Sequence, residues 1–252
     1  MDFIKMHGTR NSYLFFEGDI EDPSGVSRRL SREYGSDGII LILPSDICDY
    51  RMRIFNADGS EARMCGNGSR CVAKYVVEKC GCDKSCITLE TLSGVKRLYP
   101  HSEGGTVKTV TVDMGIADIC GDMVLSVDGI RWNAVSVSMG NPHCVVWHTD
   151  PYSLDLERIG PMFENSAAFP DRVNTEFGKV LSREKLMMRV WERGSGETMA
   201  CGTGACALAA AAVYGGYCDP DTDITVSLRG GDLSVRVNGD YRVFMTGPAE
   251  YC

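Results

Sequence analysis

Two cysteines carry the chemistry that this sequence suggests, because each ends the same motif in one of two copies of a stretch of chain. The first copy begins at Met52-Arg53-Ile54-Phe55 and reaches Cys65-Gly66-Asn67-Gly68. The second begins at Met188-Arg189-Val190-Trp191 and reaches Cys201-Gly202-Thr203-Gly204, 136 positions later. Two homologous halves would place two thiols on opposite sides of a bound carbon. That arrangement suits the removal of a proton from one face and its return to the other face.

The residues after each cysteine explain why a thiol would be reactive there. In both copies we expect C-G-x-G to open a helix, where free backbone N–H groups and the positive end of the helix dipole lower a thiol pKa and hold a carboxylate. The glycines let a ligand approach the backbone closely. A duplication that preserved packing alone is the alternative, and it is disfavoured because Asn67 and Thr203 direct polar groups toward the same pocket.

Composition and charge exclude several other functions. The chain has 252 residues, 44% of them hydrophobic and 24% charged, which is typical of a soluble globular protein. A net charge of −8 argues against binding to nucleic acid and gives no reason to expect a membrane partner. The sequence has no apolar run of transmembrane length, and residues 1–5 lack the pattern of a signal peptide. We therefore expect a cytoplasmic protein.

The twelve cysteines raise the alternatives of a metal site and of redox chemistry. Cys80, Cys82 and Cys86 have metal-like spacing, but no second pair or histidine lies nearby, so a loop with adventitious thiols is favoured. No C-x-x-C motif occurs, which disfavours a thiol–disulfide oxidoreductase. Cys71 and Cys206 are interpreted as small buried hydrophobes. We expect neither a metal nor a cofactor.

Strand patterns dominate the chain, and helices are fewer. Alternating or β-branched segments predict strands at 49–55, 106–114, 133–138, 185–191, 224–228 and 233–237. Helices are predicted at 24–34, from about 68 to 79, and from about 204 to 214. The last of these is apolar on every side, which is typical of a helix buried all round. Each half would then wrap its strands around one helix.

The motifs resemble one known family along essentially the whole chain. Residues 55–71 resemble the first active-site signature of the diaminopimelate epimerases, and residues 192–204 resemble the second. The segments Met6-His7-Gly8, 140–143, 172–174 and 246–250 match in the same order. The resemblance implies an α+β fold of two pseudo-symmetric domains, each a barrel-like, mostly antiparallel sheet around a central helix. It also implies catalysis without pyridoxal phosphate or metal.

The resemblance also implies domain bounds and roles for individual residues. Residues 1–115 would form the first domain, 116–246 the second, and about 247–252 would return to the first. Cys65 and Cys201 would be the two catalytic bases of a reaction that interconverts LL- and meso-diaminopimelate. The residues implied to bind substrate are Asn11, Asn56, Gly66, Asn67, Asn141, Asn174, Glu192, Arg193, Gly202 and Thr203. The chemistry agrees, since Arg193 offers a bidentate fork for a distant carboxylate and Glu192 suits an ammonium group.

Three points stay open at this stage. His143 is either a proton partner of one thiol or a residue that holds a loop by a hydrogen bond. The segments Thr9-Arg10-Asn11-Ser12-Tyr13 and 34–38 depart from the family pattern, so a related amino-acid racemase, such as a histidine racemase, is the alternative. Retention of Asn56, Asn174, Glu192 and Arg193 disfavours it. The expected partner is a small amino acid, and a homodimer is kept as a hypothesis.

Overall fold

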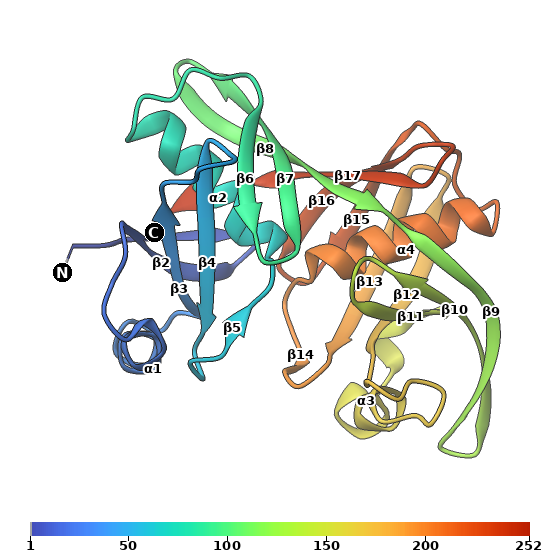
Figure 1. Cartoon of the computed structure of the whole chain (residues 1–252). Helices are drawn as coiled ribbons and strands as arrows, with labels where there is room; N and C mark the ends of the chain where they lie inside the picture. Colours follow the sequence, from blue (N-terminus) through green and yellow to red (C-terminus); the bar gives the residue numbers. More distant parts are fainter. Residues whose placement is uncertain (1) are drawn as a thin grey trace. The chain divides into compact units, whose positions relative to one another are not determined.

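The computed structural model describes residues 2–252, which divide into two compact units (Figure 1). The first unit runs to Asp113 and includes Thr246–Cys252 from the end of the chain, whereas the second is Met114–Met245. The strands β8 (Thr106–Ile116) and β17 (Arg242–Pro248) carry the chain from one unit to the other. The first unit is therefore discontinuous in sequence.

The first unit is a mixed sheet with one helix on each of two faces. Its sheet runs β18–β1–β2–β3–β4–β6–β7–β8, with β5 added on β4. The pairs β2/β3 and β4/β6 are parallel and the others are antiparallel. Its further elements are β1 (Ile4–Gly8), β2 (Asn11–Glu17), α1 (Pro23–Tyr34), β3 (Gly38–Leu43), β4 (Tyr50–Asn56), β5 (Glu61–Ala62), α2 (Gly66–Glu78), β6 (Ile87–Thr91), β7 (Gly94–Glu103) and β18 (Glu250–Tyr251).

The second unit repeats this plan. Its sheet runs β9–β10–β11–β12–β13–β15–β16, with β14 added on β13, and β11/β12 and β13/β15 are the parallel pairs. Its elements are β9 (Asp118–Val127), β10 (Ile130–Ser138), β11 (Pro142–Trp147), a 3-10 turn (Pro151–Ser153), α3 (Leu156–Glu164), β12 (Asn174–Ser182), β13 (Lys185–Glu192), β14 (Gly196–Glu197), α4 (Gly202–Tyr214), β15 (Asp223–Leu228) and β16 (Gly231–Val237).

The strand register confirms the duplication found in the sequence. Phe55 pairs with Glu61 in the first unit, and Trp191 pairs with Glu197 in the second, at an offset of 136. The offset of 137 for the later strands also holds, because β6 pairs in parallel with β4 as β15 does with β13. The α+β fold with two repeats is therefore confirmed.

Hydrophobic patterning explains why each sheet carries helices on both faces. β3 (GIILIL) is almost entirely buried, as expected for a parallel strand that is covered on both sides. Ile39 and Leu41 pack with Val26 and Leu30 of α1 on one face. Ile40 faces the start of α2 on the other. In the second unit α3 packs with β11, β12 and β13 in the same way.

The helix α4 is enclosed by its own unit, as its apolar sequence predicts. Residues 205–212 have no exposed surface, and the helix packs against β9–β13, β15 and β16. Figure 1 shows α4, in orange, running across these strands. A run of alanines suits this place because small side chains let strands approach from every side. Cys71 and Cys206 are buried among apolar neighbours, which confirms their interpretation as small hydrophobes.

Two predictions about helices were incomplete. α2 and α4 begin at Gly66 and Gly202, two residues earlier than predicted, because each cysteine itself caps the helix. α3 was not predicted, since Pro161 lies inside it and interrupts the helical pattern of the sequence. No helix among residues 2–252 is long and apolar enough to cross a membrane.

The contact between α3 and Trp191 gives a test of this packing. A Cβ atom on Gly160 would lie 2.2 Å from Cδ2 of the Trp191 ring. Gly160→Ala should lower the free energy of unfolding by about 1–2 kcal/mol, because overpacking outweighs the gain in helix propensity. The control Gly239→Ala, where the nearest atom is Asp221 Oδ2 at 4.0 Å, should be nearly neutral. Urea unfolding measures both, and equal midpoints would contradict this packing.

Candidate active site

Each of the two cysteines caps a helix that its own thiol helps to begin. Cys65 and Cys201 have extended backbone conformations at the N-caps of α2 and α4. The backbone N–H of Gly68 donates to Sγ of Cys65 at 3.4 Å, and the N–H of Gly204 donates to Sγ of Cys201 at 3.4 Å. These donors and the helix dipole favour the thiolate form. The predicted position of both cysteines at helix starts is confirmed.

In each unit an arginine and a glutamate form a bidentate ion pair, here called the arginine clamp, beside the loop that leads to the cysteine. In the first unit, Nε and Nη2 of Arg53 donate to the Glu61 carboxylate at 2.7 and 3.1 Å. In the second, Arg189 donates to Glu197 in the same bidentate way at 2.8 and 3.0 Å. Both arginines lie on the strand before the loop and both carboxylates on the short strand after the turn. The repeated sequence therefore encodes a repeated support for the thiol.

The surroundings of Cys65 are mainly hydrogen-bond donors and amides. Its thiol lies 3.5 Å from Oδ1 of Asn11, which also accepts from Nδ2 of Asn67 at 3.3 Å. Tyr13 lies close enough to the thiol for each group to act on the pKa of the other. Burial raises the pKa of Cys65, while the N–H of Gly68, Tyr13 and the charge of Arg70 oppose that rise. Asn11 and Asn67 therefore lie beside this thiol, as the resemblance implied.

The surroundings of Cys201 differ because they contain carboxylates. Burial raises the pKa of Cys201 well above its usual value, and the charges of Glu192 and Glu176 raise it further. Burial also raises the pKa of Glu192, and Thr198 and Cys201 oppose that rise. Thr203 Oγ1 lies 3.5 Å from Sγ. The two thiols thus differ in their surroundings: carboxylate charges favour the protonated form of Cys201, whereas donors and the charge of Arg70 oppose the rise in pKa at Cys65.

His143 lies in a buried pair with Glu176 on the neighbouring strand. Its Nδ1 is 2.7 Å from Oε1 of Glu176, and neither side chain has any exposed surface. Nε2 of His143 and Oε2 of Glu176 have no hydrogen-bond partner among residues 2–252. Glu176 Oε1 lies beneath the start of α4, since a Cβ on Gly204 would lie 2.7 Å from it. The structure thus gives His143 a fixed partner, while its role in proton transfer stays a prediction.

Of the residues predicted to bind the distant end of the substrate, Asn174 and Arg193 are in contact with each other. Asn174 pairs with His143 across β11 and β12, and its Oδ1 accepts from the N–H of Arg193 at 2.8 Å. Arg193 is exposed, and its Nη1 donates to the Asp171 carbonyl at 2.7 Å. Asn56 ends β4 in the first unit and is bonded to Ser60. Asn141 immediately precedes β11.

The predicted site residues fall into two groups, one in each unit. The first group consists of Asn11, Asn56, Cys65, Gly66 and Asn67. The second group consists of Asn141, His143, Asn174, Glu192, Arg193, Cys201, Gly202 and Thr203.

The sequence analysis missed three residues that contact this machinery. Tyr13 contacts Cys65, Glu176 contacts His143, and Asp37 anchors the chain beside Asn11. Oδ2 of Asp37 accepts from Asn11 Nδ2 at 3.0 Å and from the N–H of Ser12 at 2.7 Å. The available signal for Glu176 was a charged residue between Thr175 and Phe177 in a strand pattern.

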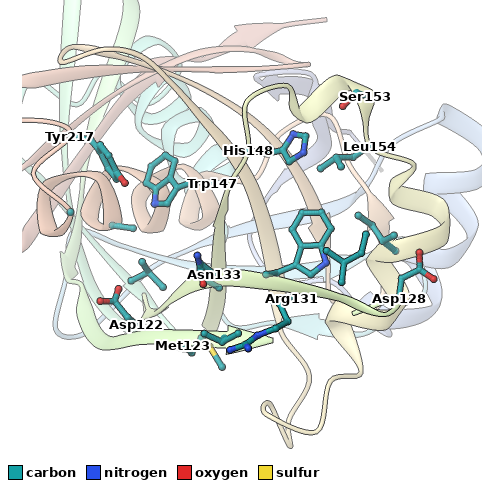
Figure 2. A pocket seen from close by; sticks show the side chains of 18 of the residues that line it. Asp122, Met123, Asp128, Arg131, Asn133, Trp147, His148, Ser153, Leu154 and Tyr217 are labelled. Atoms are coloured by element: carbon teal, nitrogen blue, oxygen red, sulfur yellow. The ribbon is translucent and has the colours of Figure 1, made fainter. Parts of the chain in front are cut away.

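A separate cavity lies in the second unit and contains none of the predicted site residues. It has a volume of about 1330 Å³ and is lined by residues of β9, β10, α3 and the end of α4 (Figure 2). The edge-to-face rings of Trp147 and Tyr217 lie along it. Among residues 2–252, no group of three His, Cys, Asp or Glu side chains could hold a metal ion. Cys80, Cys82 and Cys86 thus form no such group.

Comparison with solved structures first identifies the fold. The fold matches that of a hydroxyproline epimerase from Agrobacterium vitis, solved with bound trans-4-hydroxy-L-proline, with a TM-score of 0.76 over 99% of this chain and 90% of the other. The two sequences are 14% identical, so the likeness concerns the fold alone. The chain thus shares the fold of that protein.

Sequence comparison then identifies the family. The diaminopimelate epimerase family model matches residues 3–120 and 135–252. A diaminopimelate epimerase of Phocaeicola vulgatus is 48% identical, over 98% of this chain and 94% of its own length. One of Methanococcus maripaludis is 44% identical, over 99% of this chain and 96% of its own length. The chain belongs to the diaminopimelate epimerase family.

The clamp before Cys201 predicts a dependence of stability on pH. Burial pushes the pKa of Glu197 up, but Arg189 and Arg229 together hold it below its usual value. Because the folded-state pKa is lowered, this stabilisation is present above the unfolded-state pKa and is lost as pH falls through the folded-state value. Glu197→Gln should lower the free energy of unfolding at pH 7 by about 1.5–3 kcal/mol.

Urea unfolding from pH 7 to pH 3 measures this effect. The difference between the unmutated protein and Glu197→Gln should shrink toward the acid end. The exposed pair Asp219 and Arg183 gives a control, since Asp219→Asn should change stability by less than about 1 kcal/mol. A Glu197 effect that is constant with pH would contradict the role of this charge.

Proposed function

We propose that this protein catalyses the interconversion of LL- and meso-diaminopimelate at one α-carbon, without a cofactor. Membership of the diaminopimelate epimerase family, with relatives that match along nearly their whole length, supports this function. The observation that carries the mechanism is the pair of cysteines, each at the N-cap of a buried helix in a duplicated fold. The enzyme is an isomerase that acts on an amino acid.

In the proposed mechanism Cys65 and Cys201 are the two bases, one for each face of the α-carbon. One cysteine, as thiolate, removes the α-proton, and the other, as thiol, delivers a proton to the opposite face. The reverse reaction exchanges the two roles. The different surroundings favour Cys65 as the thiolate in the free enzyme, because burial and the charges of Glu192 and Glu176 all raise the pKa of Cys201.

The developing carbanion needs stabilisation because an α-proton is far less acidic than a thiol. We propose that the free N–H groups at the starts of α2 and α4 hold the α-carboxylate, and that they strengthen their bonds as charge moves into it. Gly66, Asn67, Gly202 and Thr203 supply these groups. Asn11 lies beside Cys65 and would help to orient the same end of the substrate.

The far end of the substrate distinguishes diaminopimelate from other amino acids. We propose that Asn56, Asn141, Asn174, Glu192 and Arg193 recognise the distant amino-carboxylate, with Arg193 as the partner of the carboxylate. The exposed guanidinium of Arg193 is held by one bond to Asp171, which leaves other donors for a ligand. His143 is proposed as a proton partner of the site. A cytoplasmic enzyme and a homodimer stay predictions.

The two-base mechanism predicts that each cysteine is required. Cys65→Ser and Cys201→Ser should each lower the rate of epimerisation by at least about 100- to 10,000-fold, because each removes proton transfer on one face. The measurement is epimerisation together with exchange of the α-proton in deuterated water. Cys206→Ala, one turn further along α4 and fully buried, is the control and should keep its activity. A Cys65→Ser enzyme with normal activity would exclude two bases.

The role of Arg193 predicts substrate specificity. Removal of the partner of a bound carboxylate should cost about 3–5 kcal/mol, or about two to four decades in kcat/KM for diaminopimelate. Arg193→Ala is compared with Arg183→Ala, a change at an exposed arginine paired with Asp219. Diaminopimelate, lysine and histidine are assayed with each enzyme. Faster turnover of histidine than of diaminopimelate by the unmutated enzyme would instead assign a histidine racemase.

A further inference from the structure

The register of β11 and β12 brings His143 and Glu176 together inside the second unit. His143 pairs in parallel with Asn174, and Glu176 lies two residues further along β12. Residues two apart on a strand point to the same face of a sheet, so these side chains share one face. At the equivalent register the first unit has Tyr13 in place of the histidine. Nδ1 of His143 is 2.7 Å from Oε1 of Glu176, and neither side chain has any exposed surface.

This pair lies under the start of α4, next to the sulfur of Cys201. A Cβ atom on Gly204 would lie 2.7 Å from Oε1 of Glu176 and 3.3 Å from Sγ of Cys201, so both atoms surround one point of the first turn. In the first unit the corresponding point, at Gly68, is 2.5 Å from Cδ1 of Ile40. The repeat therefore has an apolar side chain at this place in one half and a carboxylate in the other. The positive end of the α4 dipole stabilises a negative charge there.

A charged carboxylate determines which nitrogen of a neighbouring imidazole carries the proton. An ionised carboxylate only accepts hydrogen bonds, so Nδ1 of His143 must donate to Oε1 of Glu176. A free neutral imidazole favours the other tautomer, which has its proton on Nε2. The carboxylate therefore holds the ring in the tautomer that it adopts less often by itself, and Nε2 keeps its lone pair.

Nε2 is thus the nitrogen of His143 at which the ring exchanges a proton. It is buried and has no hydrogen-bond partner among residues 2–252. Oε2 of Glu176 has no partner in this part of the chain either, so His143 is the donor that the structure gives this carboxylate. When the ring takes up a proton at Nε2, the carboxylate at 2.7 Å compensates the buried positive charge.

We propose that Glu176 is a positioning residue for His143, which fixes the imidazole with its proton on Nδ1 and keeps Nε2 ready for proton exchange in the active site. This inference rests on the proposed function, in which His143 is a proton partner. The ring takes up a proton at Nε2 and releases it there, so no other reactant is required. Glu176 acts through the ring and keeps the Nδ1 proton in place throughout.

The direct test is the tautomer of His143 in the unmutated protein. Long-range 1H–15N NMR of protein labelled at histidine reads it at about pH 9, where histidines are ordinarily neutral, and without substrate. The chain has four histidines, and His143→Asn identifies the signal. His148 is an internal reference of the opposite kind, because the N–H of Asp150 donates to its Nδ1 at 3.1 Å. We expect the proton on Nδ1 in His143 and on Nε2 in His148. A His143 ring with its proton on Nε2 would overturn the proposal.

The second test is Glu176→Met, which keeps the length of the side chain and removes the acceptor. The His143 ring should change to the tautomer with its proton on Nε2. The kcat for diaminopimelate should fall at least about tenfold, while KM changes by less than about twofold, because the ring then presents the wrong nitrogen state for proton uptake. The measurement on the unmutated protein keeps the proposal testable even if this variant does not fold.

The control is Lys179→Met, three residues further along β12 and outside the predicted site. It should change neither the tautomer of His143 nor the rate of epimerisation. A Glu176→Met protein that loses activity but keeps the proton on Nδ1 would indicate a packing role and overturn the proposal. Failure of the proposed function would appear separately, as normal epimerisation by Cys65→Ser.

Discussion

The close approach of a strand to a helix N-terminus is the constraint on which each half of this structure depends. A cysteine can cap the helix and remain open to a ligand only if the first turn carries almost no side-chain bulk. Gly68 and Gly204 meet this need, because any Cβ there would clash with Ile40 or with Glu176. The sheet, the arginine clamp and the buried helix all fix the strand and the helix start at this distance. The position of each thiol at its helix start therefore follows from packing.

Duplication explains why the two halves share one fold. Divergence of the two copies explains why the surroundings of the two thiols differ. The pairings of the strands, the two clamps and the two N-caps are kept in both halves. The polar residues around the thiols are not kept, since one half has Tyr13 and Ile40 where the other has His143 and Glu176. A symmetric scaffold therefore holds two thiols in different surroundings. In the proposed two-base mechanism, thiols with different surroundings would share one proton unequally at rest, while identical surroundings would leave its place undefined.

Much of this arrangement could be predicted from the sequence, because comparison of the two copies of the repeat shows which positions are equivalent. The offset between Cys65 and Cys201 identified both helix starts and the strands before them, and the apolar run before Tyr214 identified a buried helix. Contacts between residues far apart in sequence were harder to predict. Tyr13 and His143 occupy equivalent positions only through strand register, at an offset of 130 that differs from 136 because the connecting loops differ in length. The helix α3 was not predicted, because Pro161 interrupts its helical sequence pattern.

The return of the chain end to the first unit has a consequence for how this protein is made. The N–H of Cys252 donates to the Lys5 carbonyl at 3.0 Å, and β18 pairs with β1. The guanidinium of Arg70 is fully buried and donates to the Pro248 carbonyl at 3.1 Å. On a ribosome residues 2–113 emerge long before residues 246–252, on which the first unit also depends. The first unit therefore cannot complete its fold until residues 246–252 are available, and until then Arg70 lacks one of the acceptors that compensate its burial.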